Sequence, residues 1–326
     1  MRQLSSPEKM TPDSVLSAFE LPLRRTFYPF GFPLQLETNS EEVLAAASEG
    51  WDAFHQTFDD APVRLCLGVL PGSGEPLAPE SVFRWRENLM SIVADAENLV
   101  VCDFSRGFAF GWVTQNTAAD HPMLQYRFLT AAGATLVEQR AFAALHGGLV
   151  ARNGKGVMLA GDSFAGKSTL AYACARSGWT YITDDCILVA RRHRDRYAVG
   201  DPHKIRFRPD APQLFPELAD CLVTFRPNGK IAIEVLTREL DIETAPGCHV
   251  DHIVYLNRVP DSKVHLSPIA KERVRADWAQ YNVLGTEDAR EARQRCHERM
   301  LNAQLWEMSY SDLDEAVALL ELLVDR

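Results

Sequence analysis

The segment GDSFAGKSTL, at positions 161–170, contains the residue types that can hold a chain of phosphates. Gly161, Gly166, Lys167 and Ser168 match the pattern G-x-x-x-x-G-K-[ST] in full. Glycines at such positions let successive backbone N–H groups point at phosphate oxygens. We therefore expect Lys167 to reach the β- and γ-phosphates of ATP or another nucleoside triphosphate, and the Ser168 hydroxyl to bind Mg²⁺. The other positions expected to contact the nucleotide are Asp162, Ser163, Phe164, Ala165 and Thr169.

Two carboxylates, Asp184 and Asp185, follow this loop after a short interval. The apolar run 157–160 before the loop predicts a strand, and 168–178 after it predicts a helix that ends near a glycine. Seventeen residues separate Lys167 from Asp184, which is enough for that helix and one more strand over 179–183. Ligands bind at the carboxyl edge of a parallel sheet, so we expect both carboxylates beside the loop. A plain surface turn would show the same two residues, and this alternative stays open.

The segment DPHKIRFRPD, at 201–210, alternates cations with apolar residues. As a strand it would place Lys204, Arg206 and Arg208 on one face. Such a face could stabilise phosphate charge, so Arg206 and Arg208 are candidate nucleotide contacts. It could equally be the solvated side of a hairpin.

The elements that must position these residues fall into two parts. Residues 1–126 are predicted to form a smaller α+β domain of unknown role. Its expected elements are a strand over 25–38, a helix over 40–54, a strand over 63–70 and a hairpin over 99–114 that turns at 105–107. Residues 127–326 are predicted to form a larger α/β domain. Its expected elements are a helix over 127–145, two strands joined at 153–154, strands at 249–256 and 304–310, and helices at 286–304 and 312–324.

Composition excludes some classes of protein. Of the 326 residues, 34 are Lys or Arg and 44 are Asp or Glu, and the resulting net charge of -10 argues against binding nucleic acid. The basic run at 190–196 is short and is expected to be a solvated turn. No apolar run approaches the ~20 residues that span a membrane, so no membrane association is expected. The seven cysteines are scattered without a CxxC pair, which predicts reduced thiols and a cytoplasmic location.

The stretch from His146 to Asp185 resembles the catalytic domain of HPr kinase/phosphorylase, which is related to ATP-dependent phosphoenolpyruvate carboxykinase. The matching segments are LHGGLV, GDSFAGKS and TDD. The resemblance implies a P-loop kinase domain of the HPr kinase/carboxykinase type over 127–326, with Asp185 as the general base that takes a proton from an attacking hydroxyl. It further implies that Asp184 supports the metal or the base, and that His146 lies near the γ-phosphate. A capping or core histidine is the alternative for His146.

The sequence departs from that family at two points. Thr169 replaces an acidic residue that often follows Lys-Ser, and no convincing Glu-x-x-Gly segment is present near 201–210. Both departures weigh against the protein HPr as the substrate and against the reverse phosphorolysis. The segment 161–185 also looks like stand-alone HPr-kinase-like proteins found beside ribosomal-peptide biosynthesis genes, which include lasso peptide kinases.

This second resemblance implies phosphorylation of a Ser or Thr hydroxyl of a small peptide. Three alternatives remain at this stage. They are a kinase of a small-molecule hydroxyl such as that of an amino acid, a carboxykinase-like enzyme, and a non-catalytic nucleotide sensor. The oligomeric state is open, with a homo-oligomer among the options.

Overall fold

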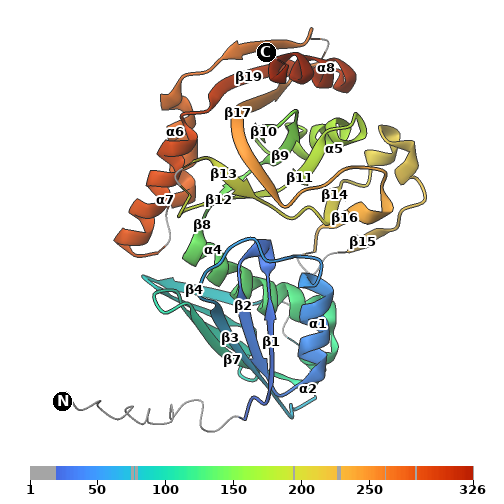
Figure 1. Ribbon diagram of the computed structural model, residues 1–326. Coiled ribbons are helices and arrows are strands. Elements are labelled where there is room, and N and C mark those ends of the chain that lie inside the picture. The colour runs from blue at the N-terminus through green and yellow to red at the C-terminus, as the bar shows by residue number, and fades with distance from the viewer. Residues whose placement is uncertain are drawn as a thin grey trace, which may run out of the picture.

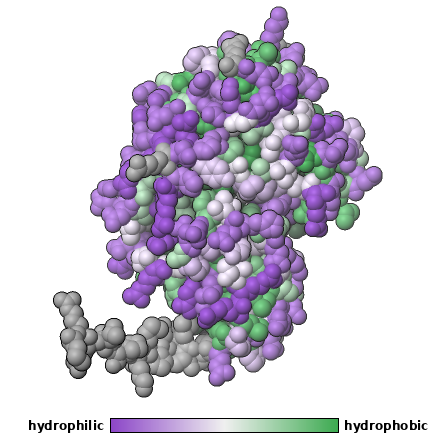
Figure 2. Space-filling model, viewed as in Figure 1, coloured by the Kyte–Doolittle hydropathy of each residue, from purple (hydrophilic) through white to green (hydrophobic). Residues whose placement is uncertain are grey.

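The computed structural model describes residues 20–74, 77, 80–193, 195–225, 229–260, 262–282 and 285–325. Within these ranges the protein is a mixed α/β structure with three sheets of seven, nine and three strands. Figure 1 shows the seven-stranded sheet in the lower half and the nine-stranded sheet in the upper half. Hydrophilic residues cover most of the face seen in Figure 2, and apolar residues reach it in small patches. Every helix among the described residues is too short or too polar to serve as a membrane span.

The seven-stranded sheet has the order β1-β2-β3-β7-β6-β5-β4. Its strands are β1 (Leu23–Phe27), β2 (Leu34–Thr38), β3 (Val63–Leu70), β4 (Val82–Arg86), β5 (Leu89–Val93), β6 (Leu99–Asp103) and β7 (Phe108–Thr114). The strand expected over 63–70 and the hairpin at 105–107 are confirmed. The single strand expected over 25–38 is wrong, because Pro29 begins a 3₁₀ turn, η2 (Pro29–Gly31), that reverses the chain between β1 and β2.

Helices cover one face of this sheet. They are α1 (Glu41–Trp51), α2 (Gln115–Ala119) and a continuous helix made of α3 (His121–Leu124), η3 (Gln125–Ala134) and α4 (Thr135–Ala141), whose middle part widens to π geometry. Buried residues of the long helix pack in the same hydrophobic cluster as the sheet. The long helix crosses position 126, so the domain boundary expected there stays a prediction.

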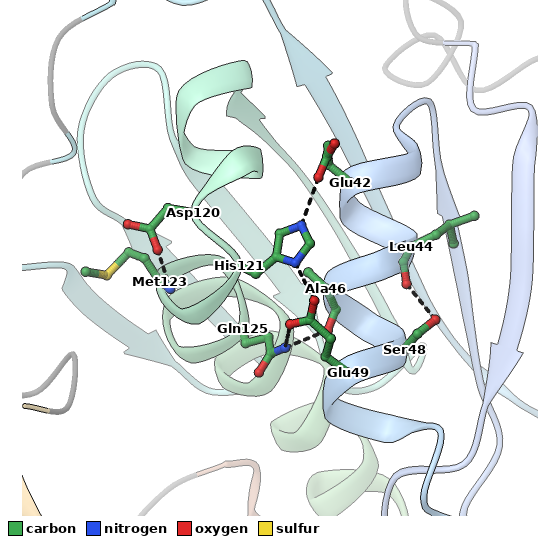
Figure 3. A network of polar contacts seen from close by, with 9 residues as sticks. All are labelled: Glu42, Leu44, Ala46, Ser48, Glu49, Asp120, His121, Met123 and Gln125. Carbon is green, nitrogen blue, oxygen red and sulfur yellow. Dashed lines mark hydrogen bonds and ion pairs between the residues drawn. The ribbon is translucent and has the colours of Figure 1, made fainter. Parts of the chain in front are cut away.

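His121, at the start of the long helix, forms hydrogen bonds with two carboxylates of α1 (Figure 3). The Nδ1 atom of His121 lies 2.6 Å from the Glu49 carboxylate, and the Nε2 atom lies 2.9 Å from the Glu42 carboxylate. Because both ring nitrogens face a carboxylate, the charged imidazolium, which donates from both, fits this position best. These hydrogen bonds raise the pKa of His121, that to Glu49 first and that to Glu42 next.

The helix expected over 127–145 ends early. It stops at Ala141, and Phe142–His146 form strand β8, which pairs with β12 (Cys186–Ala190). Alanine and leucine favour a helix locally, but burial of Phe142 and Leu145 within a sheet overrides that preference. This correction matters for the site, because the β8–β12 register sets Cys186 opposite His146.

The nine-stranded sheet has the order β11-β9-β10-β17-β13-β12-β8, with β19 on β17 and β18 on β19. Its remaining strands are β9 (Gly148–Arg152), β10 (Lys155–Ala160), β11 (Thr180–Thr183), β13 (Tyr197–Val199), β17 (Gly247–Arg258), β18 (His265–Pro268) and β19 (Gln304–Tyr310). The turn at Asn153-Gly154 is confirmed, since both residues have positive φ. Strands β10, β17 and β19 run parallel, so their carboxyl ends meet at one edge.

The third sheet has the order β14-β16-β15, with β14 (Lys204–Phe207), β15 (Val223–Phe225) and β16 (Ile231–Leu236). The remaining helices are α5 (Lys167–Arg176), α6 (Lys271–Trp278), α7 (Glu287–Met300) and α8 (Leu313–Val324). Short 3₁₀ turns are η4 (Ala211–Gln213), η5 (Pro216–Leu218), η6 (Thr237–Glu239) and η7 (Ala279–Asn282). Helix α5 contacts β9 and β11 of the nine-stranded sheet, β14 of the three-stranded sheet, and the C-terminal helix α8. These three elements of the fold therefore enclose it.

Candidate nucleotide-binding site

The loop 161–169 lies at the carboxyl end of β10 and leads into α5. Its conformation needs glycine twice, because φ is 136° at Gly161 and 94° at Gly166. A Cβ atom at Gly166 would also collide with the hydroxyl of Tyr310, at the end of β19. That hydroxyl donates a hydrogen bond of 2.8 Å to the carbonyl of Ala165. The loop is therefore held against the parallel strands in one shape, with the first turn of α5 behind it.

Lys167 is the first residue of α5 and is only 6% exposed. Its ammonium donates to the carbonyls of Gly161 at 2.9 Å and Asp162 at 3.0 Å, so it lies over the start of the loop. Burial lowers the pKa of Lys167, while the charges of Asp185, Asp162 and Asp277 oppose that effect. The loop thus carries one buried cation at the place where the sequence pattern expects it.

Asp184 comes directly after β11 and is 5% exposed. The Tyr181 hydroxyl donates to it at 3.0 Å, and the Ser168 hydroxyl is a second hydrogen-bond partner. Burial, followed by the charge of Asp185, raises the pKa of Asp184 to about 6 despite these hydrogen bonds. Arg206 also lowers this pKa, with the weakest effect of these groups, and a cation bound beside the carboxylate would offset its buried charge.

The Ser168–Asp184 pair fits a magnesium ion. Mg²⁺ prefers oxygen ligands and is usually bound through one or two carboxylates, with phosphates and waters in the remaining places. Ser168 and Asp184 offer one hydroxyl and one carboxylate oxygen, next to a loop that can orient phosphates. In the part of the chain that the structure describes, no group of three or more His, Cys, Asp or Glu is arranged to hold a metal ion.

Asp185 and His146 meet because β8 and β12 pair. The Nδ1 atom of His146 lies 3.2 Å from the Asp185 carboxylate and 2.9 Å from the Asp185 carbonyl. Both partners are acceptors, so Nδ1 carries the proton. The side chains are 44% and 59% exposed, so His146 is not a core residue. Its expected place beside a γ-phosphate stays a prediction, whereas its contact with Asp185 is a feature of the fold.

The cations of segment 201–210 divide between two places. On β14, Ile205 and Phe207 are buried while Lys204 and Arg206 occupy the opposite face, as the alternation predicts. The Arg206 Nε atom donates to Glu234 at 2.7 Å, and Glu234, with help from Asp184 and Asp201, raises the pKa of Arg206 against the effect of burial.

Arg208 lies beyond the end of β14, so the expectation of three cations on one strand face is wrong. Its guanidinium is 4.9 Å from the ring centre of Phe164, and its Nε atom is 3.6 Å from the Asp210 carboxylate. Phe164 is 77% exposed and has a positive φ of 73° at the tip of the loop. Arg208 therefore adjoins the loop through an aromatic contact and not through the strand face.

Three residues of the site, Asp277, Tyr255 and Tyr310, could not be identified from the sequence. Asp277, on α6, is close enough to act on Lys167, and the Tyr255 hydroxyl donates to its carboxylate at 3.0 Å. Tyr310 fixes the loop as described. None of the three belongs to a motif, and Asp277 is more than a hundred residues from the loop. The parallel order of β10, β17 and β19 brings Tyr255 and Tyr310 to the loop, and the hydrogen bond from Tyr255 joins Asp277 of α6 to them.

Comparisons with known proteins give one distant structural similarity and no sequence match. No protein-family model matches the sequence, and no curated protein matches it either. Among solved structures, the chain is similar to one described as "Structure of the Hpr(Ser) kinase/phosphatase from Coxiella burnetii". The identity is 12% and the TM-score is 0.29, over 55% of this chain and 96% of that chain. A likeness this distant carries no argument about activity, so the function has to be inferred from the geometry of the site itself.

Proposed function

We propose that the protein is an ATP-dependent kinase that transfers the γ-phosphate to a hydroxyl group. The observation that carries the proposal is the position of Asp185. This exposed carboxylate lies near the buried ammonium of Lys167, and a protonated His146 nitrogen orients it. A loop that only holds a nucleotide has no need of such a carboxylate, whereas an attacking hydroxyl needs a group to accept its proton.

The roles of the residues follow from their places. The backbone amides of the loop and Lys167 bind the β- and γ-phosphates, and Ser168 and Asp184 hold Mg²⁺, which offsets phosphate charge when bound. Asp185 accepts the proton of the acceptor hydroxyl while the hydroxyl oxygen forms a bond to the γ-phosphorus and the bond from that phosphorus to the β,γ-bridging oxygen breaks. ADP leaves with the electron pair of that bond. His146 positions Asp185 through its Nδ1–H group.

For the acceptor, we propose a Ser or Thr side chain of a small, ribosomally made peptide of the lasso type. The motif segments GDSFAGKS and TDD support this choice through their resemblance to peptide kinases of that kind. Phe164 supports it as well, since an exposed aromatic ring at the tip of the loop can contact an apolar part of a peptide. A cytoplasmic location fits the seven cysteines, all of which are free thiols.

Acceptor-dependent release of ADP tests this proposal. The wild-type protein would be incubated with ATP, Mg²⁺ and either candidate peptides or free hydroxy amino acids. The products would be identified by mass spectrometry. We expect peptides to accelerate ADP release, and Lys167→Ala to abolish it, whereas Lys263→Ala at an exposed site leaves it unchanged. Phosphorylated amino acids without phosphorylated peptides would replace the peptide by a small-molecule acceptor. Nucleotide binding with no phosphorylated acceptor would leave a sensor or a simple ATPase.

A further inference from the structure

A pocket of about 400 Å³ lies beside α5, outside the catalytic residues described above. Its floor is the second half of α5, including Ala173. One wall is the turn at Leu214 and Phe215, and the other is formed by Arg258 at the end of β17 and Asp314 in the first turn of α8. This volume lies within the range of small-molecule binding sites.

The pocket adjoins Tyr310, the residue that anchors the loop 161–169. Tyr310, which bonds to the loop at Ala165, is followed by the residues of the pocket wall, and it pairs with Arg258 in the β17–β19 register. Ala173 is six residues after Lys167, which is about 9 Å along the helix axis. A nucleotide whose β- and γ-phosphates lie at Lys167 can therefore extend along α5 into this pocket.

The apolar wall of the pocket is fixed in place. Phe215 is only 2% exposed, and the guanidinium of Arg176 lies 5.4 Å from its ring centre. Arg176 in turn forms an ion pair of 2.9 Å with Glu217, to which the Tyr172 hydroxyl donates at 3.0 Å. Leu214 stays 45% exposed on the pocket side of this anchored turn. An apolar surface that is held rigid suits a flat aromatic ligand.

The opposite wall supplies polar groups of both signs. Arg258 is exposed at the end of β17 and lines the pocket, and its guanidinium can pair with an α-phosphate there. Asp314 is exposed in the first turn of α8 and lines the pocket, and its carboxylate can accept hydrogen bonds from ribose hydroxyls. The pocket lining thus combines a cation, a carboxylate and an apolar wall, the three kinds of group that the phosphate, the sugar and the base of a nucleotide require.

We infer that this pocket binds the nucleoside half of the nucleotide, with the base against Leu214 and Phe215 and the ribose at Asp314. The inference rests on the proposed function, because it assumes that the phosphates lie in the loop 161–169. It adds the residues that distinguish a nucleoside triphosphate from a bare phosphate chain.

The test compares MgATP with magnesium and inorganic triphosphate, which lacks the nucleoside. Leu214→Glu places a charge beside the base and should weaken ATP binding about tenfold or more, while triphosphate binding changes less than about twofold. The matched control is Leu322→Glu, at a leucine that is 59% exposed on α8, and it should change neither affinity. Asp314→Ala is a second variant that leaves the apolar wall intact, and it should also weaken ATP selectively. Titration calorimetry on the full chain gives both affinities, and circular dichroism checks that each variant folds.

Three results would overturn the inference in different ways. If wild-type protein binds ATP no more tightly than triphosphate, the nucleoside has no pocket, but the kinase proposal stands. If both variants keep the ATP affinity and instead raise the KM for the acceptor, the pocket belongs to the acceptor. If the wild-type protein binds neither ATP nor triphosphate, the proposed function fails together with the inference.

Discussion

Replacing Asp184 with asparagine should make the folded protein more stable at neutral pH, although it removes a proposed metal ligand. Asp184 is buried, and its pKa is raised to about 6 from an ordinary value of 3.8, chiefly by burial. The folded state therefore opposes ionisation of this group. The side-chain amide of the Asp184→Asn variant would keep an oxygen for the Tyr181 hydroxyl to donate to, without a charge to bury.

The size and pH dependence of the gain follow from the two pKa values. In the unfolded chain Asp184 ionises near pH 3.8, and in the folded protein only near pH 6. Below the lower value both states are protonated, so no destabilisation exists. As pH rises from about 4 to about 6 the cost grows, and above pH 6 it reaches its full size of about 3 kcal/mol, at 1.36 kcal/mol for each unit between the two values.

Thermal unfolding measures this effect. The midpoint of Asp184→Asn should exceed that of the wild type by about 5 °C at pH 8, and the difference should shrink towards zero at pH 4. The matched control is Asp210→Asn, at a carboxylate that is 58% exposed, and it should shift the midpoint by less than about 1 °C at either pH. Adding MgATP should then stabilise the wild type much more than Asp184→Asn, because the variant lacks the carboxylate that holds the metal.

Two results would refute this reasoning. A lower midpoint for Asp184→Asn at pH 8 would mean that the ionised carboxylate stabilises the fold through its partners. An equal gain at pH 4 and pH 8 would mean that the gain comes from packing and not from the buried charge. In either case the raised pKa of Asp184 would no longer support a cation-binding role for this carboxylate.

Three further predictions concern single residues. Lys167→Ala should lower nucleotide affinity and abolish phosphoryl transfer, so equal turnover in that variant would remove the loop from the mechanism. Asp185→Asn should slow transfer by about 10²- to 10⁴-fold while the Kd for MgATP stays within about twofold, and lost ATP binding would make Asp185 a structural group. His121→Gln should lower the thermal midpoint below pH 6.5 and have less effect as the pH rises through the raised pKa of His121, because only the imidazolium can donate to both Glu42 and Glu49 (Figure 3). A deficit that is the same at pH 5.5 and pH 9 would contradict that account.

Local signals were enough for much of the fold. The strand at 63–70 and the turn at Asn153-Gly154 depend on alternation and on residues that tolerate positive φ, and both are visible within a few residues of sequence. The loop at 161–169 and the interval to Asp184 can likewise be recognised from a short stretch of sequence. A glycine pattern and a length of one helix plus one strand predict that Asp184 lies beside the loop, and in the structure the Ser168 hydroxyl is one of its hydrogen-bond partners.

The features that could not be predicted from the sequence depend on contacts with segments far away in the chain. Phe142–His146 is built from good helix formers, and only its pairing with Cys186–Ala190 makes it a strand. The hairpin of β4 and β5 was not predicted, because its strands carry several charged and exposed residues at the edge of the sheet. Asp277 reaches the site only through the way α6 packs against the ends of the parallel strands, and no local pattern encodes that.

The most direct test of the account follows the γ-phosphate itself. ATP labelled with ¹⁸O on the γ-phosphate would be incubated with the protein, Mg²⁺ and a serine-containing candidate peptide, and the products would be analysed by mass spectrometry. The account predicts a labelled phosphate on a side-chain oxygen of the peptide, formed by the wild type and about 10²- to 10⁴-fold more slowly by Asp185→Asn. Labelled inorganic phosphate without a labelled acceptor, formed equally fast by both proteins, would contradict it.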